Sequence, residues 1–309
     1  MEKTELSIAT ILHNEEANVV ELHRRLSTVL KTLNKTHEII LVDDGSTDRT
    51  LDKLKTLRQK DRSIKIISLS RNFGIEAAAT AALDHTSGEM VVLMDGDLQD
   101  APEFIPSLLN KIGQGYDVVY AQHPKRKDTL VKQALFGSFY RLMDKLADYK
   151  FPVDVGHFSV MRRPVVDVLT QMTERNRFIA GLRAWVGFKQ TGILYEKQAR
   201  FAGKPPQTFK KLLKMGFDAL FSFSYIPLRV ATLMGLLVAI GTIIVIINVL
   251  YQKFVVNTAI IGWAGPMLSI LIIGGVQLFI LGIIGEYLAR IYDEVKRRPY
   301  YIVSEKIGF

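Results

Sequence analysis

The sequence predicts an α/β protein with a mostly parallel sheet, followed by a hairpin of two membrane-spanning helices. Two observations carry this prediction. Between residues 6 and 149, short apolar runs alternate with longer segments of helical periodicity, as in a parallel sheet whose strands are joined by helices. Further on, Pro227–Leu250 and Trp263–Gly285 are apolar runs, each long enough to cross a hydrocarbon core of roughly 30 Å at about 1.5 Å per residue.

The α/β part contains five candidate strands and five candidate helices in alternation. The strands are expected at Leu6–Leu12, Glu38–Val42, Ile64–Leu69, Met90–Met94 and Val118–Ala121, and the helices at Glu15–Leu33, Asp48–Lys60, Ile75–His85, Pro102–Ile112 and Thr129–Tyr149. No Gly-x-Gly-x-x-Gly follows the first strand, and no Gly-x-x-x-x-Gly-Lys-Ser/Thr occurs anywhere. A dinucleotide-dependent dehydrogenase and a P-loop NTPase are therefore disfavoured.

The fourth strand ends in Asp95-Gly96-Asp97, which offers two carboxylates to a divalent metal. Hard oxygen ligands suit Mg²⁺ or Mn²⁺, and Gln99 is a candidate third ligand. In a regular strand the two aspartates would lie about 6–7 Å apart. We therefore expect the chain to leave the strand at Gly96. A polar turn that merely caps a buried strand is the alternative.

The second strand also runs into acidic residues, Asp43 and Asp44, followed by a glycine and a candidate helix N-cap at Ser46 or Thr47. Ligands of open α/β sheets bind at the carboxyl ends of parallel strands. Asp43 or Asp44 is therefore a candidate acceptor for a ribose hydroxyl or a base N–H.

The composition limits the remaining possibilities. The chain has 309 residues, 48% of them hydrophobic, so it has room for a sizeable core and for two structural units. It contains no Cys, which excludes disulfides, thiolate catalysis and Cys-ligated zinc. The charged N-terminus is not a signal peptide. The formal charge of +9 lies largely beside the apolar runs, where anionic headgroups would attract it, so it does not predict nucleic-acid binding.

The charge around the two apolar runs predicts their orientation. The connecting loop Tyr251–Gly262 carries a single Lys, whereas basic residues flank both outer ends of the hairpin: Lys204, Lys210, Lys211, Lys214 and Arg229 before it, and Arg290, Lys296, Arg297, Arg298 and Lys306 after it. The positive-inside rule then places both termini in the cytoplasm. Gln207–Phe223 has an apolar stripe and leads into the first span, so we expect an in-plane membrane helix there. For Thr129–Tyr149 a core helix and a membrane-surface helix stay equally open.

At this point the ordered motifs resemble those of a known family. They are Asn14-Glu15, Asp43-Asp44-Gly45-Ser46-x-Asp48, Arg71-Asn72-Phe73-Gly74, Asp95-Gly96-Asp97-Leu98-Gln99-Asp100 with Pro102, and Arg200-Phe201-Ala202-Gly203-Lys204, followed by two spans. This order resembles the family 2 polyisoprenyl-phosphate glycosyltransferases over essentially the whole chain. The bactoprenol glucosyltransferase branch, related to dolichyl-phosphate mannose synthases, is the most similar.

The resemblance implies a Rossmann-like GT-A fold, a nucleotide-sugar donor, a polyprenyl-phosphate acceptor and Mg²⁺ or Mn²⁺ as cofactor. Carried onto this sequence, it implies nucleotide-sugar binding by Ile11, Asn14, Glu15, Asp43, Asp44, Arg71, Asn72 and Asp95, and metal binding by Asp95, Asp97 and Gln99. The candidate catalytic residues are Asp95, Asp97, Asp154 and His157. Candidates for the lipid phosphate or the donor diphosphate are Lys125, Arg126, Lys127, Arg200 and Lys204.

The chain departs from the family at three places. The first strand ends in Ile11-Leu12-His13-Asn14-Glu15 where Pro-x-Tyr-Asn-Glu is common, His157 stands near a position where relatives commonly have Asp, Ser or Cys, and Lys125-Arg126-Lys127 replaces a pair of arginines. His157 is therefore either a hydrogen-bonded structural residue or a catalytic one. Arg183-Ala184-Trp185 resembles part of a processive-synthase motif, but the full Gln-x-x-Arg-Trp is missing.

Together these observations predict four segments: a cytoplasmic catalytic domain over residues 1–205, a juxtamembrane amphipathic helix over 206–226, a transmembrane hairpin over 227–289 and a basic cytoplasmic tail over 290–309. The expected reaction is inverting transfer of one hexose, glucose from UDP-glucose, to undecaprenyl-type phosphate in the cell membrane. Mannose, N-acetylglucosamine or an aminoarabinose derivative as the sugar, a processive synthase and a non-catalytic nucleotide-binding protein are the alternatives. A homo-oligomer stays open.

Overall fold

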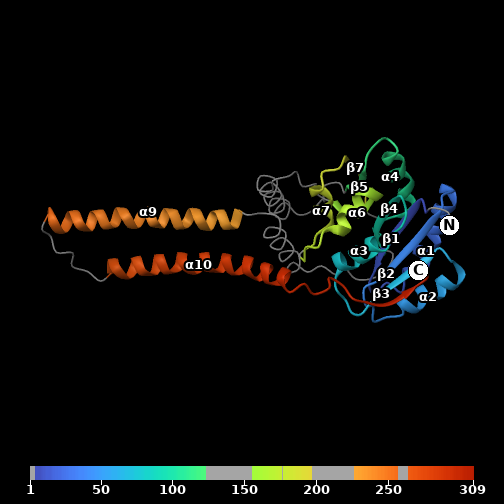
Figure 1. Ribbon diagram of the computed structural model, residues 1–309, viewed down its shortest axis with the longest axis horizontal. Coiled ribbons are helices and arrows are strands. Elements are labelled where there is room, and N and C mark those ends of the chain that lie inside the picture. The colour runs from blue at the N-terminus through green and yellow to red at the C-terminus, as the bar shows by residue number, and fades with distance from the viewer. Residues whose placement is uncertain (1–3, 123–154, 176, 197–225, 257–263) are drawn as a thin grey trace. The chain divides into compact units, whose positions relative to one another are not determined.

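The computed structural model describes residues 4–122, 155–175, 177–196, 226–256 and 264–309. The chain divides into two compact units. The first comprises Met1–Thr208 together with Arg298–Phe309, and the second is Phe209–Arg297. The first unit is an α/β domain, and the described part of the second consists of two long helices (Figure 1).

The α/β unit is built on an eight-stranded sheet with the order β7-β5-β6-β4-β1-β2-β3-β8. The strands are β1 (Leu6–Leu12), β2 (His37–Asp43), β3 (Ile64–Leu69), β4 (Met90–Asp95), β5 (Val118–Gln122), β6 (Val155–Arg162), β7 (Gln190–Leu194) and β8 (Val303–Ile307). Strand β1 is parallel to both β2 and β4, β2 is parallel to β3, and β5 is parallel to β7. Among the strands of the described residues, β6 and β8 alone run antiparallel to their neighbours. The predicted mostly parallel α/β sheet is confirmed.

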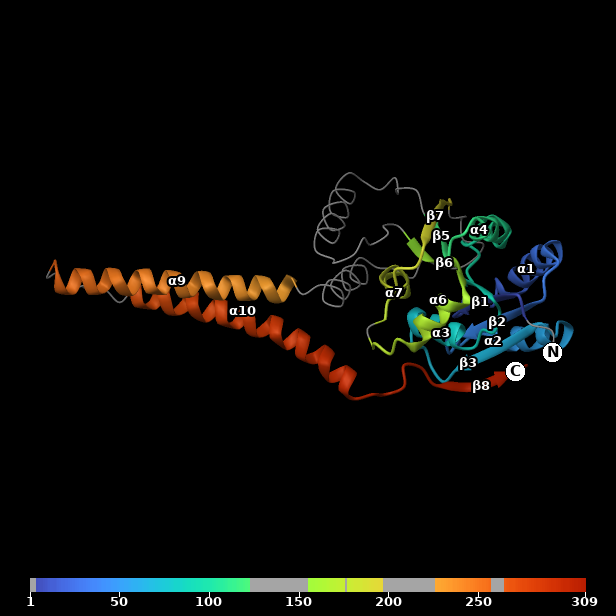
Figure 2. The same cartoon turned by 45° about the horizontal axis from the view of Figure 1, so that its top comes forward.

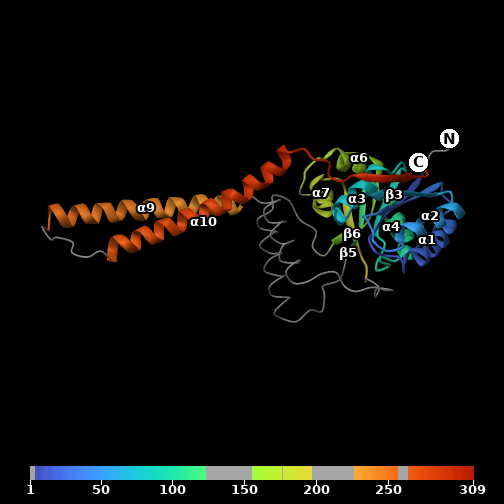
Figure 3. The same cartoon turned by 90° about the horizontal axis from the view of Figure 1, so that it is seen from below.

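Helices cover both faces of the sheet (Figures 2 and 3). One layer consists of α1 (Val19–Leu33), α2 (Thr50–Lys60), the 3₁₀ turn η1 (Pro102–Phe104) and α4 (Ile105–Ile112), and the other of α3 (Ile75–Asp84), α6 (Arg163–Gln171) and α7 (Ile179–Trp185). Because both faces are covered, the central strands are mostly apolar, and all seven residues of β1 are buried, Ser7 and Thr10 included.

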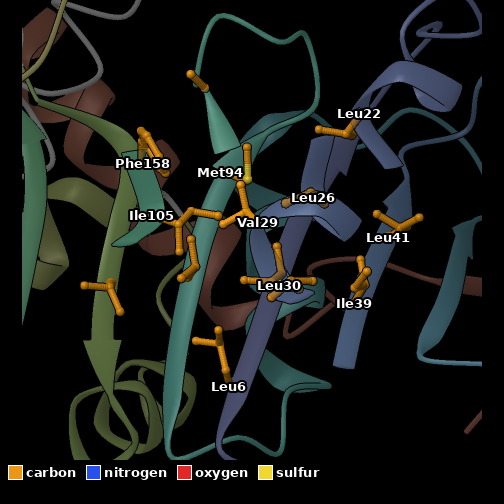
Figure 4. Packing of buried hydrophobic residues seen from close by; sticks show 14 of the residues in the cluster. Leu6, Leu22, Leu26, Val29, Leu30, Ile39, Leu41, Met94, Ile105 and Phe158 are labelled. Atoms are coloured by element: carbon orange, nitrogen blue, oxygen red, sulfur yellow. The ribbon is translucent and has the colours of Figure 1, made fainter. Parts of the chain in front are cut away.

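The main hydrophobic core lies between the sheet and the α1 layer (Figure 4). Leu22, Leu26 and Leu30 recur at helical spacing on α1 and point toward the strands. Met94 at the end of β4 belongs to the same cluster. The core therefore reaches the carboxyl end of β4 and fixes the position of the acidic turn that follows.

The structure contains strands and helices that the sequence analysis does not predict. Strands β6 and β7 and helices α6 and α7 lie beyond the fifth strand, and β8 lies in the segment expected to be only a basic tail. Strand β8 pairs with the edge of β3, where Ser70 N donates to Ile302 O at 2.9 Å. Tyr301 Oη donates to Asp84 at 2.8 Å on α3. The segment from Arg298 onward is therefore part of the α/β unit.

The second unit contains α9 (Ile226–Phe254) and α10 (Ala264–Val295), which lie side by side (Figure 1). Ala231–Gln252 and Ile272–Val295 are long and apolar enough to cross a membrane. Neither stretch is buried within the protein, unlike the core helices of a soluble domain. Helix α10 continues ten residues past the predicted span end at Gly285, to Val295. The expected in-plane helix at 207–223 and the helix at 129–149 lie outside the described residues.

Candidate active site

The carboxyl ends of β1, β2 and β4 lie side by side at one edge of the sheet. Ile11 is in register with Asp95 of β4 on one side and with Val42 of β2 on the other, and Leu12 is in register with Asp43. Because the three strands are parallel, the residues that follow them emerge at the same edge. The two acidic strand ends predicted from the sequence therefore flank a common strand.

The chain leaves β4 at Asp95 and turns at Gly96, as predicted. Gly96 N donates to Ile11 O at 2.9 Å, and a Cβ at Gly96 would lie 2.4 Å from a methyl of Leu12. Glycine is therefore required here by the close approach of β1. Asp97 follows within the turn and accepts from Gln99 N at 3.1 Å.

Tyr195, just after β7, binds the backbone of the residues that follow Asp97 in this acidic turn. Its hydroxyl donates to Gln99 O at 2.7 Å and accepts from Ala101 N at 2.7 Å. The ring packs against Phe104 and Phe158, with ring centroids 4.7 and 5.6 Å away. Burial raises the pKa of Tyr195, so the hydroxyl stays protonated and remains a donor. The turn that contains Asp97 is thus fixed by a tyrosine that belongs to an aromatic cluster.

The carboxylates at the end of β2 are buried and bind the chain itself. Asp43 accepts from Ser46 N at 3.2 Å and from Ser68 Oγ at 3.3 Å. Asp44 accepts from the backbone N–H groups of Phe73 and Gly74 at 2.8 and 3.0 Å. Burial raises the pKa of Asp44 above its ordinary 3.8, against the lowering effect of those two backbone donors.

The turn after β2 touches the loop after β3 directly at Gly45. This glycine has φ +59°, and a Cβ on it would lie 2.3 Å from the carbonyl carbon of Arg71. The Arg71-Asn72-Phe73-Gly74 motif is therefore held beside the Asp43-Asp44 motif by backbone contact as well as by Asp44. Arg71 and Asn72 themselves are exposed, and the Arg71 guanidinium lies 4.2 Å from the centroid of the Phe73 ring.

The loop after β1 is tied to the same turn by Asn14, which has the left-handed φ of 55°. Asn14 N donates to Ser46 Oγ at 2.9 Å, and Asn14 Oδ1 accepts from Thr47 N at 2.8 Å. Ser46 and Thr47 therefore do not cap α2, which corrects the sequence-based expectation. Asp48 instead accepts from Thr50 N at 3.0 Å at the start of that helix. The neighbouring Glu15 N donates to Thr50 Oγ1 at 2.9 Å.

His157 on β6 lies between two carboxylates. Its Nδ1 is 3.1 Å from Asp95 Oδ1, and its Nε2 is 3.3 Å from Glu76 Oε1. Only 8% of the residue is exposed. Burial alone would lower the pKa of His157, but Glu76 and Asp95 outweigh that effect and raise it from 6.5 to about 10. The imidazole is therefore cationic near neutral pH.

A second buried cation, Arg183 on α7, supports the strand that carries His157. The Arg183 guanidinium donates to Ser159 Oγ at 2.6 Å and to Gly156 O at 3.3 Å, and Ser159 Oγ donates to His157 O at 2.8 Å. Burial lowers the pKa of Arg183 from its ordinary value to about 10, which leaves it charged. Within the Arg183-Ala184-Trp185 motif, Arg183 thus helps to hold β6 in place, whereas Trp185 is exposed.

Some of the predicted site residues lie outside the part of the chain that the structure describes. They are Asp154, Lys125, Arg126, Lys127, Arg200 and Lys204. The structure brings together Ile11, Asp43, Asp95 and Asp97 at the sheet edge and adds Glu76, which the sequence analysis missed. Its position in the first turn of α3, directly after the Arg71–Gly74 motif, is the only local signal for it.

The donor set fits a divalent metal that a substrate helps to bind. Within the described residues, no three His, Cys, Asp or Glu side chains are grouped so that they could hold an ion by themselves. Mg²⁺ in transfer enzymes is commonly held by one or two carboxylates together with substrate phosphates. Asp95 and Asp97 on either side of Gly96 supply such a pair.

Comparison with known proteins decides the family. A glycosyl transferase family 2 domain matches residues 7–170, more than half of the chain. The chain belongs to glycosyl transferase family 2. The family resemblance predicted from the ordered motifs is therefore confirmed, and the protein is a glycosyltransferase.

Relatives match this family member along nearly its whole length. The chain is 43% identical over 305 residues to an uncharacterized glycosyltransferase, sll0501, of Synechocystis sp., covering 98% of this chain and 96% of the relative. It is 35% identical over 301 residues to the bactoprenol glucosyl transferase of Shigella phage SfII, covering 97% of each. A solved structure of glucosyl-3-phosphoglycerate synthase from Mycobacterium tuberculosis with Mn²⁺, UDP and phosphoglyceric acid is 20% identical, with a TM-score of 0.46, covering 71% of this chain and 76% of that one.

Proposed function

We propose that this glycosyltransferase moves one glucose from UDP-glucose to a polyprenyl phosphate of the undecaprenyl type, with inversion and with Mg²⁺ or Mn²⁺. The observation that carries the proposal is the pairing of the Asp95-Gly96-Asp97 turn with two apolar helices in one chain. A nucleotide-sugar site and a membrane anchor suit a water-soluble donor and a lipid acceptor. The relative named bactoprenol glucosyl transferase, matched over 97% of both chains, supports glucose as the sugar and a bactoprenol lipid as the acceptor.

The donor diphosphate belongs beside Asp95 and Asp97. A divalent ion at this pair would neutralise the charge that develops on the leaving diphosphate. The residues of the chain supply position: the Gly96 contact with β1 and the Tyr195 hydroxyl fix the turn in which both aspartates sit. Since Asp43 and Asp44 bind backbone groups, they shape the nucleotide loops, and the exposed Arg71 and Asn72 are available to the donor.

The acceptor needs no strong base. A phosphate monoester has a second pKa of about 6, so its oxygen is already anionic near neutral pH. It needs an in-line position behind the anomeric carbon and cations to hold it. Lys125, Arg126, Lys127, Arg200 and Lys204 are the candidates for this role.

A transfer assay tests the proposal. The full chain in detergent is incubated with undecaprenyl phosphate and, in turn, labelled UDP-glucose, UDP-N-acetylglucosamine, GDP-mannose and a UDP-aminoarabinose derivative. We expect one lipid-extractable product that carries a single sugar, formed best with UDP-glucose. A product with several sugars would identify a processive synthase. No product with any donor, despite UDP binding, would identify a non-catalytic nucleotide-binding protein.

The orientation can be tested separately, because the chain has no native Cys. Basic residues outside both ends of the hairpin predict a cytoplasmic α/β unit and a loop that faces away from the cytoplasm. In intact cells, an Asn257→Cys variant should react with an impermeant maleimide, and a Ser304→Cys variant should react only after permeabilisation. The reverse labelling pattern would refute the cytoplasmic donor site.

A further inference from the structure

His157 lies between the carboxylates of Asp95 and Glu76, and this position indicates a role that the family assignment does not give. Both ring nitrogens lie within hydrogen-bonding distance of a carboxylate oxygen, at 3.1 Å from Asp95 and 3.3 Å from Glu76. Ionised carboxylates only accept hydrogen bonds. Each ring nitrogen is therefore directed at a carboxylate oxygen.

Glu76 is itself anchored at its other oxygen. Glu76 Oε2 accepts from Ile179 N at 2.9 Å, at the first residue of α7. The three side chains thus connect the start of α3 and the start of α7, through β6, to the end of β4. Of these three residues, Asp95 alone belongs to the acidic turn. His157 and Glu76 can therefore affect the turn only through their contact with Asp95.

We propose that His157 is a positioning residue: with Glu76 behind it, His157 fixes the carboxylate of Asp95 for the metal and the donor diphosphate and does not deprotonate the acceptor. This inference rests on the proposed function. Partners that orient a metal ligand are often as important as the ligand, and their loss typically costs about 10–100-fold in metal affinity or activity.

A base at position 157 would need a nitrogen lone pair directed at the acceptor. Here one nitrogen points at a donor-site carboxylate and the other at a carboxylate held by α7. The proposed acceptor is an anion near neutral pH, so the reaction does not require that base. The geometry and the chemistry of the acceptor therefore agree on a positioning role.

The test compares binding with turnover in the full chain. Calorimetry measures the Kd of Mn²⁺ in the presence of saturating UDP for the wild type, His157→Ala, His157→Gln, Glu76→Gln and the double variant His157→Ala/Glu76→Gln. We expect about 10–100-fold weaker Mn²⁺ binding for His157→Ala, with kcat reduced and the KM for lipid phosphate unchanged. His157→Gln and Glu76→Gln should give smaller losses. The double variant should match His157→Ala, since Glu76 acts through His157.

His23→Ala is the matched control. His23 also pairs with a carboxylate, Asp61, at 2.9 Å, but on α1 and α2 away from the sheet edge. It should leave the Mn²⁺ affinity and kcat unchanged. A general stability defect would lower the melting temperature of both histidine variants, whereas only the His157 variants should lose Mn²⁺ affinity.

Two results would overturn the inference. Unchanged Mn²⁺ affinity with a large loss of kcat in His157→Ala would make His157 the base, and unchanged values of both would make it merely structural. A wild type that binds no Mn²⁺ with UDP would instead refute the proposed function. The contact between His157 and Glu76 can be tested without ligand. The shifts in melting temperature of His157→Ala and Glu76→Gln should not add up in the double variant. Additive shifts would show that the two side chains do not interact.

Discussion

Strands β2 and β4 both run into an aspartate-rich turn at the same edge of the sheet, on either side of β1, but their carboxylates have different partners. At the end of β2, Asp43 and Asp44 accept hydrogen bonds from backbone N–H groups of nearby loops and from the Ser68 hydroxyl on β3. At the end of β4, Asp95 is paired with a cationic histidine and Asp97 lies in a tight turn held by Tyr195. The β2 end holds neighbouring loops together, and the β4 end is the proposed site of the metal and the donor diphosphate.

This difference predicts different roles for two similar sequences at one sheet edge. A carboxylate that accepts from two backbone donors holds neighbouring loops together, and its removal leaves both N–H groups without their acceptor. A carboxylate that a side chain from another strand orients should keep its orientation when a ligand binds. Substitutions at the β2 end should therefore change mainly stability, and substitutions at the β4 end should change mainly turnover.

The largest effect is expected at the β4 end. Asp97→Asn should reduce sugar transfer by about 10²-fold or more, because it removes charge that a bound metal needs while the amide oxygen can still accept from Gln99 N. The melting temperature should barely change. The exposed helix residue Asp52 gives the matched control, Asp52→Asn, with wild-type activity. Transfer by Asp97→Asn within about tenfold of wild type in saturating Mn²⁺ would refute the metal assignment.

The next largest effect is a loss of stability on substitution of Gly45, the glycine after β2. Gly45→Ala adds a Cβ that meets the Arg71 backbone at 2.3 Å and adopts a left-handed φ, so we expect a loss of about 2–4 kcal/mol in the free energy of unfolding. Gly187→Ala is the control, because Gly187 also has a positive φ, of +74°, but the nearest atom to its Cβ position is 3.9 Å away. Equal losses in denaturant titrations of the two variants would show that the close approach costs nothing.

Asp44→Ala should give a smaller loss of stability. It leaves the N–H groups of Phe73 and Gly74 without their acceptor, which costs about 1–3 kcal/mol, partly offset by removing a buried charge. Turnover at saturating donor should fall far less than in Asp97→Asn. Denaturant unfolding and steady-state kinetics on the same preparation measure both. A variant of wild-type stability but without transfer activity would place Asp44 in the chemistry and abolish the contrast between the two ends.

The smallest effect is a pH dependence at the start of β2. Burial favours the neutral form of Glu38, but bonds from Lys65, Ser7 and Ser87 outweigh it and hold its pKa below the ordinary 4.5. A lowered folded-state pKa contributes stability that is present above the unfolded pKa and lost as pH falls through the folded pKa. The free energy of unfolding should therefore drop below about pH 4.5 in the wild type and less steeply in Glu38→Gln.

The raised pKa of Asp44 has the opposite sign. The stability linked to its proton is present below the unfolded pKa of 3.8 and is lost as pH rises through the higher folded pKa. Asp44→Ala should therefore steepen the acid loss that Glu38→Gln flattens. The exposed Glu174→Gln serves as control for both. Parallel pH curves for all variants would contradict the assigned shifts.

The sequence predicts those parts of the fold that depend on local pattern. The first four strands follow from alternating apolar runs and helices, and the turn at Gly96 follows from the glycine between two aspartates. The family, the mostly parallel sheet and the two apolar helices are confirmed. Strand β8 could not be predicted, because Val303–Ile307 is short, carries two charges and pairs with a strand more than 230 residues earlier in the chain.

The site was predictable only in part, for the same physical reason. Asp95 and Asp97 stand out at a strand end, but the partners that orient them come from distant segments. Glu76 and His157 are 81 residues apart, and Tyr195 is 96 residues from Gln99. Long-range pairing of polar side chains leaves no periodic signal in the sequence. Likewise, Ser46 and Thr47 have the side chains of helix caps, and only the left-handed Asn14 shows that they are used elsewhere.

The central claim is that the β4 end binds a divalent ion together with the donor diphosphate. Titration of Mn²⁺ followed by electron paramagnetic resonance, with and without UDP, tests it most directly. Because Asp95 and Asp97 alone form an incomplete site, Mn²⁺ should bind at least about tenfold more tightly with UDP than without it, and Asp97→Asn should abolish that difference. Equal Mn²⁺ affinity with and without UDP, or an unchanged difference in Asp97→Asn, would contradict the account.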